Sequence, residues 1–342
     1  MTTMPDPRRD ARRESCRESR RQWLRALAAA WLPVAGPAPL RAQGSLPVAL
    51  RLVLTAPPGS SIDLLGRMVA ERLRERLGVP VVPDNRPAAG GTAGTGEVAR
   101  AAADGATIGL SFTGPLVLAP MLQSRLPYDP ERQLAPIVLL GTAPNLLAVN
   151  ASLPVASFRE FIGHVRARPG RLNYSSSGNG SSAHLAMELL KAQAGLFIVH
   201  VPYNGAPPAA QAAAAGDVDA IMANPTALLP LIKAGRLRAL ATTGRGRWAG
   251  MSELPTVAES GFAGFEALAW NGFVAPAGTP REWLERLNRE INAIVSAPDF
   301  KPRAEAAGWD VAGGSIEAFA GFMRAERARW APVVKRSGAK ID

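Results

Sequence analysis

The sequence predicts an α/β fold with two domains. Short apolar runs typical of β-strands alternate with amphipathic helical segments from residue 46 to about residue 280. About ten strands and about ten helices are expected, which is more than one sheet comfortably holds. A length of 342 residues with 47% apolar composition is sufficient for two hydrophobic cores.

The first strand is expected at 48–55 and the first helix at 60–77, where leucine or valine recurs every fourth residue from Leu65 to Leu77. Further strands are expected at 79–82, 107–111, 137–140, 146–149, 172–175, 198–201, 220–222 and 237–242. Further helices are expected at 92–103, 157–167, 183–194, 206–215 and 226–234, and then at 281–296, 299–307 and 315–336. This alternation indicates parallel sheets with helices on both faces.

The net charge of +11 divides unevenly along the chain. Residues 1–43 contain nine arginines and four acidic residues, a net of +5, which leaves +6 for the remainder. The remainder has no run of Lys and Arg interleaved with aromatic residues, which argues against nucleic-acid binding. A mildly basic globular protein is compatible with anionic ligands.

Residues 1–44 have the pattern of a cleaved export signal. Arg20 and Arg21 precede an apolar, alanine-rich stretch that reaches about Leu40, and Ala42-Gln43-Gly44 follows as a small-residue cleavage site. The paired arginines favour the twin-arginine route over the general one. An amphipathic first helix or a membrane anchor is the alternative, but three prolines interrupt the apolar stretch. We therefore expect a soluble protein in the periplasm after cleavage.

Cys16 is the only cysteine and lies within the segment expected to be removed. The mature chain would then have no disulfide, no thiolate nucleophile and no Cys-ligated metal. Neither a nucleotide-binding glycine motif nor a histidine cluster with metal-ligand spacing is present. The sequence thus predicts no cofactor and no metal.

Three turns rich in Gly and Ser lead from a strand towards a helix. In the first, 56–63, Ser60 and Asp63 have the spacing of a capping box, which is a purely structural role. The functional interpretation is that free N–H groups and the positive end of the helix accept a carboxylate or phosphate. Gly59 would permit close approach of the backbone.

The second turn, 85–92, is interpreted as a tight turn with a helix start rather than as a ligand contact. The third contains eight consecutive Ser, Gly or Asn residues at 175–182, between a strand and a helix. Its hydroxyl and N–H groups can bind an anion without a counter-charge, so we expect ligand contact there.

A catalytic role has little support in the sequence. A serine nucleophile needs a base within reach, and the chain has only His164, His184 and His200. No Gly-x-Ser-x-Gly motif is present. An amidase-like periplasmic hydrolase that uses the Ser-rich loop stays open as the alternative function.

Eight segments, three of which contain the turns described above, together resemble the solute receptors of tripartite tricarboxylate transporters, the Bug family. The resemblance covers about 48–340 and follows the order of the family. The matching segments are 57–59 with Asp63, 85–87 with Gly90-Gly91, 126–130, 172–185, 200–203, 233–240, 255–261 and 273–280.

The resemblance implies a type II periplasmic-binding-protein clamshell with two mixed sheets flanked by helices and a hinge of two crossing strands. Domain 1 would comprise 45–140 plus 272–342, and domain 2 would comprise 141–271. The implied function is capture of a small carboxylate, such as a di- or tricarboxylate or an aromatic acid, for the membrane subunits of the transporter. The implied protein is a monomer and not an enzyme. A ligand sensor for a signalling system would have the same sequence features.

Carried over from the family, the carboxylate would lie between the first and third turns. On the first side the candidate ligand-binding residues are Pro58, Gly59, Ser60, Ser61 and Asp63, with Ser111 and Thr113 as further lining. On the second side they are Ser177, Gly178, Asn179, Gly180, Ser181, Ser182, His184, Tyr203 and Asn224.

The chain departs from the family pattern at three places. Ser60 replaces the second Gly of a Gly-Gly pair, Asn204 replaces a Lys, and Ala223-Asn224 replaces Asp-Asn. Many receptors of the family hold a ligand amine or hydroxyl with that Asp. Its loss disfavours amino-acid ligands and favours plain or aromatic carboxylates.

Overall fold

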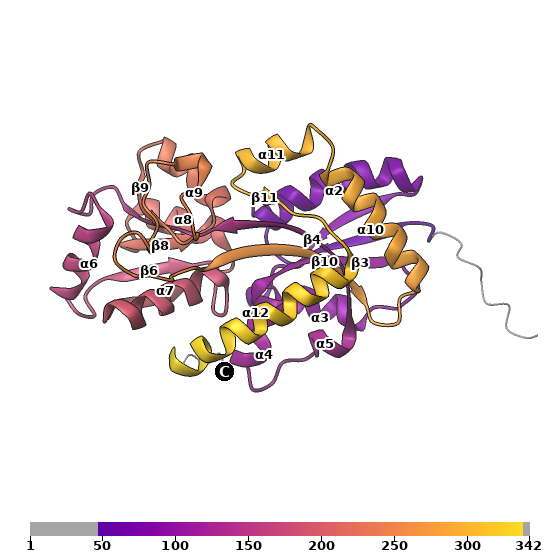
Figure 1. Ribbon diagram of the computed structural model, residues 1–342, viewed down its shortest axis with the longest axis horizontal. Coiled ribbons are helices and arrows are strands. Elements are labelled where there is room, and N and C mark those ends of the chain that lie inside the picture. Colours follow the sequence, from indigo (N-terminus) through magenta and orange to yellow (C-terminus); the bar gives the residue numbers. More distant parts are fainter. Residues whose placement is uncertain (1–46, 338–342) are drawn as a thin grey trace, which may run out of the picture. The chain divides into compact units, whose positions relative to one another are not determined.

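Two β-sheets organise residues 47–337, the part of the chain that this computed structural model describes (Figure 1). The described residues lie within one compact unit, residues 46–342. The expectations for the export signal and Cys16 fall outside the described residues. No helix in the described range is long and apolar enough to cross a membrane.

The first sheet has six strands in the order β11-β4-β10-β3-β1-β2. Their bounds are β1 Leu50–Leu54, β2 Val81–Asn85, β3 Thr107–Phe112, β4 Leu134–Pro144, β10 Leu268–Pro276 and β11 Asp310–Val311. The second sheet has five strands in the order β7-β6-β8-β5-β9. Their bounds are β5 Leu146–Asn150, β6 Asn173–Ser176, β7 Val199–Pro202, β8 Ala220–Ala223 and β9 Leu237–Thr242.

Helices follow most of the strands, as the alternating pattern predicts. The helices of the first part are α2 Ser61–Leu77, α3 Thr92–Arg100, α4 Ala119–Leu122 and α5 Pro130–Gln133. Those associated with the second sheet are α6 Phe158–Arg166, α7 Ser182–Ala194, α8 Ala206–Ala215 and α9 Pro225–Lys233. The C-terminal segment contains α10 Arg281–Val295, α11 Phe300–Ala306 and α12 Ile316–Ser337, which confirms its helical character.

Both sheets are mixed, so the purely parallel sheets expected from the alternation are wrong, and the mixed sheets implied by the resemblance are confirmed. In the first sheet β1 is parallel to β2 and β3, but β10 is antiparallel to β3 and β4. In the second, β6 is parallel to β7 and β8, but β5 is antiparallel to β8 and β9. The reason is that the chain passes between the sheets along strands rather than through helical crossovers.

The two passages between the sheets lie side by side and are hydrogen-bonded to each other. Strands β4 and β10 pair along their whole length in Figure 1, and only Asn145 separates β4 from β5. The N–H of Asn145 donates to Oγ1 of Thr243 at 2.8 Å, and its Nδ2 donates to the carbonyl of Ala267 at 2.9 Å. Oγ1 of Thr243 donates to that same carbonyl at 2.7 Å.

Apolar residues on each side of the sheets form the core. One cluster packs α2 and α10 against the first sheet, with Leu73 and Ile291 fully buried. Another packs α7 and α12 together, with Leu190 and Trp330 buried. Helix α12 thus contacts both β4 and α7.

Candidate functional site

A cavity lies where loops from the two sheets meet. Its volume open to the centre of a water molecule is about 60 Å³. From the first sheet it is lined by Thr55, Ala56, Pro57, Ser60, Ser61, Ile62, Pro87, Gly90, Gly91, Phe112, Thr113, Ala269, Trp270 and Asn271. From the second sheet and the C-terminal segment it is lined by Ser177, Ser181, Ser182, Gly205, Ala206, Asn224 and Trp309.

Five helices begin at this cavity. The N-cap residues of α2, α3, α7, α8 and α9 are Ser60, Gly91, Ser181, Gly205 and Asn224, and all five line it. The first N–H groups of an α-helix have no partner within the helix, and the helix dipole places about half a positive charge at that end. The backbone therefore places partial positive charge around the cavity, whose wall contains no Lys, Arg or His; α8 contributes least, because Pro207 and Pro208 in its first turn have no N–H.

The first turn forms the cap that the sequence predicts. Oγ of Ser60 accepts the N–H of Asp63 at 3.3 Å, which confirms the helix start at Ser60. The carboxylate of Asp63 does not return the bond to Ser60. It accepts instead from the N–H of Gly59 at 3.0 Å and from Nε of Arg67 at 2.7 Å. Although burial opposes the effect, these two bonds hold the pKa of Asp63 below its ordinary value.

Gly59 and Asp63 consequently lie outside the cavity. Both line a separate surface depression together with Arg67. Pro58, which precedes them, is not among the residues that line the cavity. Of the candidates in the first turn, the structure brings Ser60 and Ser61 to the cavity wall.

The Ser-rich third turn reaches the cavity wall near both of its ends. Ser177 lies at the cavity, and so do Ser181, whose Oγ accepts the N–H of His184 at 3.1 Å, and Ser182. This cap confirms the helix start at Ser181. Gly178 and Gly180 have left-handed backbones, with φ of 121° and 72°, which favour glycine. Together with Asn179 they lie beside the cavity rather than in its wall.

The middle of this turn contacts the first sheet's loops instead. A Cβ placed on Gly90 would lie 3.2 Å from the carbonyl oxygen of Asn179. One placed on Gly114 would lie 3.0 Å from the carbonyl oxygen of Gly180. A Cβ on Gly205 would lie 2.4 Å from Cγ of Pro57. Glycines thus allow the loops of the two sheets to approach one another around the cavity.

His184 lies behind the turn, in a buried group of side chains. Its Nδ1 accepts the N–H of Gly180 at 3.2 Å, and its ring stacks on His200 with centroids 4.2 Å apart. Burial lowers the pKa of His184, and burial together with the neighbouring His184 lowers the pKa of His200 to about 3. His200 also pairs its Nε2 with Oγ of Ser176 at 2.7 Å.

The remaining candidates divide between the cavity and its surroundings. Thr113 lines the cavity and its Oγ1 accepts the N–H of Trp270 at 3.3 Å. Ser111 is fully buried and pairs with Thr95 at 2.8 Å. Tyr203 does not line the cavity, whereas Asn224 does.

Several lining residues were not among the sequence candidates. Gly90 and Gly91, in the turn interpreted as structural, reach the cavity wall with φ of 63° and 88°. The Gly-Gly pair directly before a helix was the sequence feature that could have identified these two residues as part of the site. Asn271 and Trp309 come from segments that only the tertiary fold brings to the site, and no local pattern marks them.

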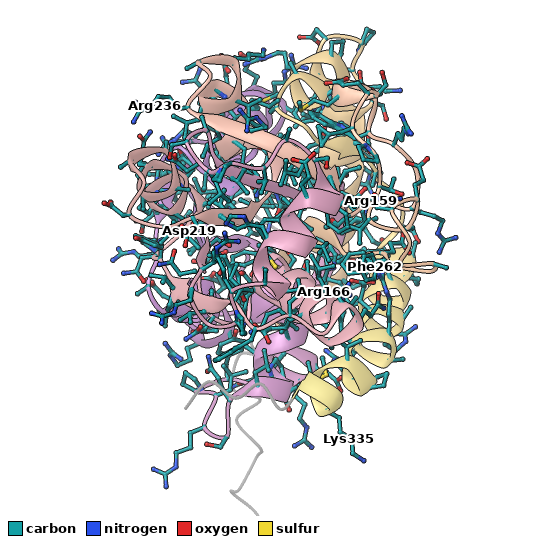
Figure 2. The ribbon with its side chains drawn as sticks, turned by 90° about the vertical axis from the view of Figure 1, so that its left-hand side faces the viewer. Arg159, Arg166, Asp219, Arg236, Phe262 and Lys335 are labelled. Carbon is teal, nitrogen blue, oxygen red and sulfur yellow. The ribbon has the colours of Figure 1, made fainter. Side chains whose placement is uncertain are left out.

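Two arginines bind carbonyl groups at the C-terminal ends of helices beside the second sheet. Arg166 donates to the carbonyl of Ala194, the last residue of α7, at 2.7 Å, and Arg236 donates to Ala214 near the end of α8 at 3.0 Å. Figure 2 labels both arginines. Cations at helix C-termini complement the dipole. The cavity end of each helix is therefore left to the backbone N–H groups.

A cavity between the loops of two mixed α/β sheets, with two strands crossing between them, is typical of the two-domain periplasmic solute-binding proteins. Residues 65–339 match the family described as the tripartite tricarboxylate transporter family receptor, and the chain belongs to this family. The suspected membership in this family is thereby confirmed.

Individual relatives agree with this assignment. The chain is 36% identical to protein BugT of Bordetella pertussis over 293 residues, which is 85% of this chain and 90% of the relative. Among solved structures it is similar to R. palustris Rpa4515 with adipate, with a TM-score of 0.84, 35% identity, and coverage of 87% of this chain and 100% of that one. It is also similar to MatC (Rpa3494) from Rhodopseudomonas palustris with bound malate, with a TM-score of 0.80, 29% identity, and coverage of 84% and 100%.

Proposed function

We propose that this chain captures a small carboxylate in the periplasm and presents it to the membrane subunits of a tripartite tricarboxylate-type transporter. The observation that carries the proposal is the convergence of five helix N-termini on one cavity without any charged side chain in its wall. Backbone N–H groups at helix N-termini are a ready site for an anionic group. The similar structures described with adipate and malate support a carboxylate rather than a phosphate.

The carboxylate binds between the caps at Ser60 and Ser181. Each hydroxyl accepts a bond from its own helix, so its proton is free to be donated to the ligand. Ser61 and Ser182 add two more hydroxyls at the same helix ends. The backbone N–H groups of these helix ends are the principal donors. Hydrogen bonds to a charged group each contribute about 1.5–3 kcal/mol, so two or three of them support micromolar affinity.

The apolar part of the ligand packs against the aromatic and aliphatic wall. Phe112, Trp309 and Ile62 supply this surface, and Trp309 is held by a bond from its Nε1 to Oγ1 of Thr226 at 2.9 Å. Burial of apolar surface contributes roughly 25 cal/mol per Å². The wall thus favours an organic acid over an inorganic anion.

We infer that the protein is a binder and not a hydrolase. A hydrolase needs a serine at the ligand with a base in contact with it. Among the described residues, the Ser–His pair with a short contact is Ser176 and His200, and Ser176 is fully buried outside the cavity wall. Ser181 and Ser182 line the cavity, but His184 faces away from them towards Gly180 and His200.

The proposed domains follow the two sheets, except that residues 141–144 of β4 and 268–271 of β10 belong to the first sheet but fall within domain 2. We assign 45–140 plus 272–342 to domain 1 and 141–271 to domain 2, with closure about the paired strands at Asn145 and Ala267. Ligand contacts from both sheets' loops stabilise the closed form over an open one. The protein acts as a monomer, because one copy of the chain supplies both walls of the cavity.

We further propose that residues 1–44 direct export by the twin-arginine route and are then removed. Replacing both Arg20 and Arg21 by Lys should leave the precursor in the cytoplasm, as fractionation and immunoblotting would detect. Normal periplasmic accumulation of that variant would exclude the twin-arginine route.

The decisive experiment is thermal unfolding of residues 45–342 against a library of small organic acids, followed by calorimetry on those that stabilise the protein. A ligand at 100 times its Kd adds about 2.7 kcal/mol to the unfolding free energy. The bound acid should be recovered unchanged by mass spectrometry after long incubation. Turnover that Ser181→Ala abolishes would replace the receptor by a hydrolase.

A further inference from the structure

Two buried polar atoms without a partner lie in side chains that line the same cavity. Among the described residues, Oδ1 of Asn224 and Nδ2 of Asn271 are the buried side-chain nitrogen or oxygen atoms that lack a hydrogen bond. Both residues belong to the cavity wall. Buried polar groups in folded proteins are nearly always hydrogen-bonded, so each such exception requires an explanation.

Asn224 does not use its side chain to cap its own helix. An N-cap asparagine normally accepts an N–H from the first turn, as the hydroxyls of Ser60 and Ser181 do here. Asn224 makes no such bond, and Pro225 supplies no N–H at the first helical position. The carbonyl oxygen of this amide is therefore left without a donor.

Asn271 lies in β10, opposite Phe112 of β3, in a strand that is buried from Ala269 to Pro276. Only 2% of Asn271 is exposed. Asparagine is unfavourable in buried strands, where an apolar side chain would pack without an unmade bond. A ligand that accepts from Nδ2 explains its presence.

We propose that Asn224 and Asn271 form a subsite that binds a hydroxyl group of the ligand, so that the receptor selects short hydroxycarboxylic acids. The inference rests on the carboxylate site proposed above. A hydroxyl donates one hydrogen bond and accepts others, so a single hydroxyl placed between the two side chains would satisfy both Oδ1 of Asn224 and Nδ2 of Asn271.

Other substituents satisfy at most one of the two amides. An ammonium group has only donors and leaves Nδ2 of Asn271 unpaired, and no Asp or Glu in the wall balances its charge. A second carboxylate has only acceptors and leaves Oδ1 of Asn224 unpaired. A methylene group satisfies neither amide.

The size of the cavity favours a short acid. The volume open to water centres is about 60 Å³, which is small beside the roughly 300–1,000 Å³ of most ligand pockets. A three- or four-carbon acid with one hydroxyl is of a size that suits this volume. The proposed preference for hydroxy acids differs from the plain or aromatic carboxylate expected from the sequence. That expectation was based on Ala223 alone, whereas the hydroxyl subsite is formed by Asn224 and Asn271.

Two matched sets of acids test the proposal. Calorimetry on the mature protein would compare both enantiomers of lactate with propionate and alanine, and both enantiomers of malate with succinate and aspartate. We expect the hydroxy acid of at least one set to bind about tenfold or more tightly than its partner without the hydroxyl, because a site built for a hydroxyl rejects the analogue that lacks it.

Variants of Asn224 and Asn271 then test whether these two amides cause the preference for hydroxy acids. Asn224→Ala and Asn271→Ala should each reduce the affinity ratio of the hydroxy acid to its deoxy partner to about twofold or less. Neither should greatly lower the melting temperature of the free protein, because each removes a buried polar atom that has no partner. Asn224→Asp, which keeps the side-chain shape, should shift preference from malate towards aspartate. Asn150→Ala is the control: it removes a 2.7 Å bond to Ala213 away from the cavity and should lower the melting temperature without changing selectivity.

The outcomes are distinguishable. Equal binding of hydroxy and deoxy acids to the wild type, or an unchanged ratio in both Ala variants, would overturn the hydroxyl subsite and leave the carboxylate receptor standing. If none of the short acids in either set binds, the carboxylate proposal fails for this size class and the subsite fails with it.

Discussion

Gly180 donates its backbone N–H to Nδ1 of His184 at 3.2 Å, and this bond ties the Ser-rich turn to a buried stack of rings. His184 stacks on His200, and His200 stacks on Tyr174 with centroids 4.7 Å apart. Nδ1 can accept only while it is unprotonated. The turn beside the cavity therefore depends on neutral histidines.

Stability should fall as these histidines become protonated. Their pKa values in the folded protein lie below the unfolded value of about 6.5, and that of His200 is about 3. The unfolded state thus binds protons first, so the contribution is complete above about pH 6.5 and is lost as pH falls towards 3. The slope is at most about 1.4 kcal/mol per pH unit for each histidine. Urea unfolding at pH values between 6.5 and 3 measures this slope of the unfolding free energy against pH.

Matched variants separate the histidine contribution from that of the carboxylates. His200→Gln keeps a hydrogen-bonding group near Ser176 and should flatten the slope between pH 6.5 and 3. His164→Gln, on the outer face of α6, should leave it unchanged. An identical slope in the wild type and His200→Gln would show that this stack does not govern acid stability.

The helix caps at the cavity should matter more for stability than for affinity. Ser60→Ala and Ser181→Ala each remove a capping bond and should lower the unfolding free energy by about 1 kcal/mol. Affinity should fall only several-fold, because backbone N–H groups remain. Ser157→Ala removes the equivalent cap of α6, an Oγ that accepts from the N–H of Glu160 at 3.2 Å, and should lower stability alone. A hundredfold loss of affinity in either cavity variant would assign the carboxylate to the hydroxyls instead.

Closure of the two domains around the ligand should be hindered by a methyl group added where the loops of the two sheets meet. Gly114→Ala would place Cβ 3.0 Å from the carbonyl oxygen of Gly180, which opposes the closed arrangement. We expect weaker ligand binding and, because this Cβ would also lie 3.0 Å from Cε2 of Phe112, a small fall in the melting temperature of the free protein. Gly163→Ala in α6 meets nothing within 4 Å and should retain affinity. X-ray scattering of Gly114→Ala with saturating ligand would detect a more open average. Wild-type affinity in this variant would contradict tight closure at Gly180.

Ligand affinity should depend only weakly on salt. No Lys or Arg lines the cavity, and helix N-termini in a buried site are screened less than exposed charges. Gly180→Asp should abolish binding, because it places a negative charge beside the caps on a backbone with φ of 72°. Calorimetry from low to high salt measures the first effect. A steep loss of affinity with salt, or full binding by Gly180→Asp, would place the ligand elsewhere.

The helix starts at the cavity could be predicted from the sequence because their signals are local. Ser60 and Ser181 each precede an apolar periodic segment, and each caps its helix as expected. The antiparallel strand β10 could not be predicted from the sequence, because its residues are buried on both faces and show no alternation of apolar and polar residues. Asn271 and Trp309 reach the cavity only through the tertiary fold, so no spacing in the sequence connects them with Ser60.

The five helix starts also bear on how such a receptor changes over evolutionary time. A main-chain N–H persists through every substitution except proline, so no single side-chain change deletes the anchor for the anionic group. The wall residues, by contrast, contribute through their side chains and can be exchanged one at a time. A duplicated copy could therefore acquire a new solute through changes in residues such as Asn271 or Trp309 while continuing to hold the acid end throughout the transition.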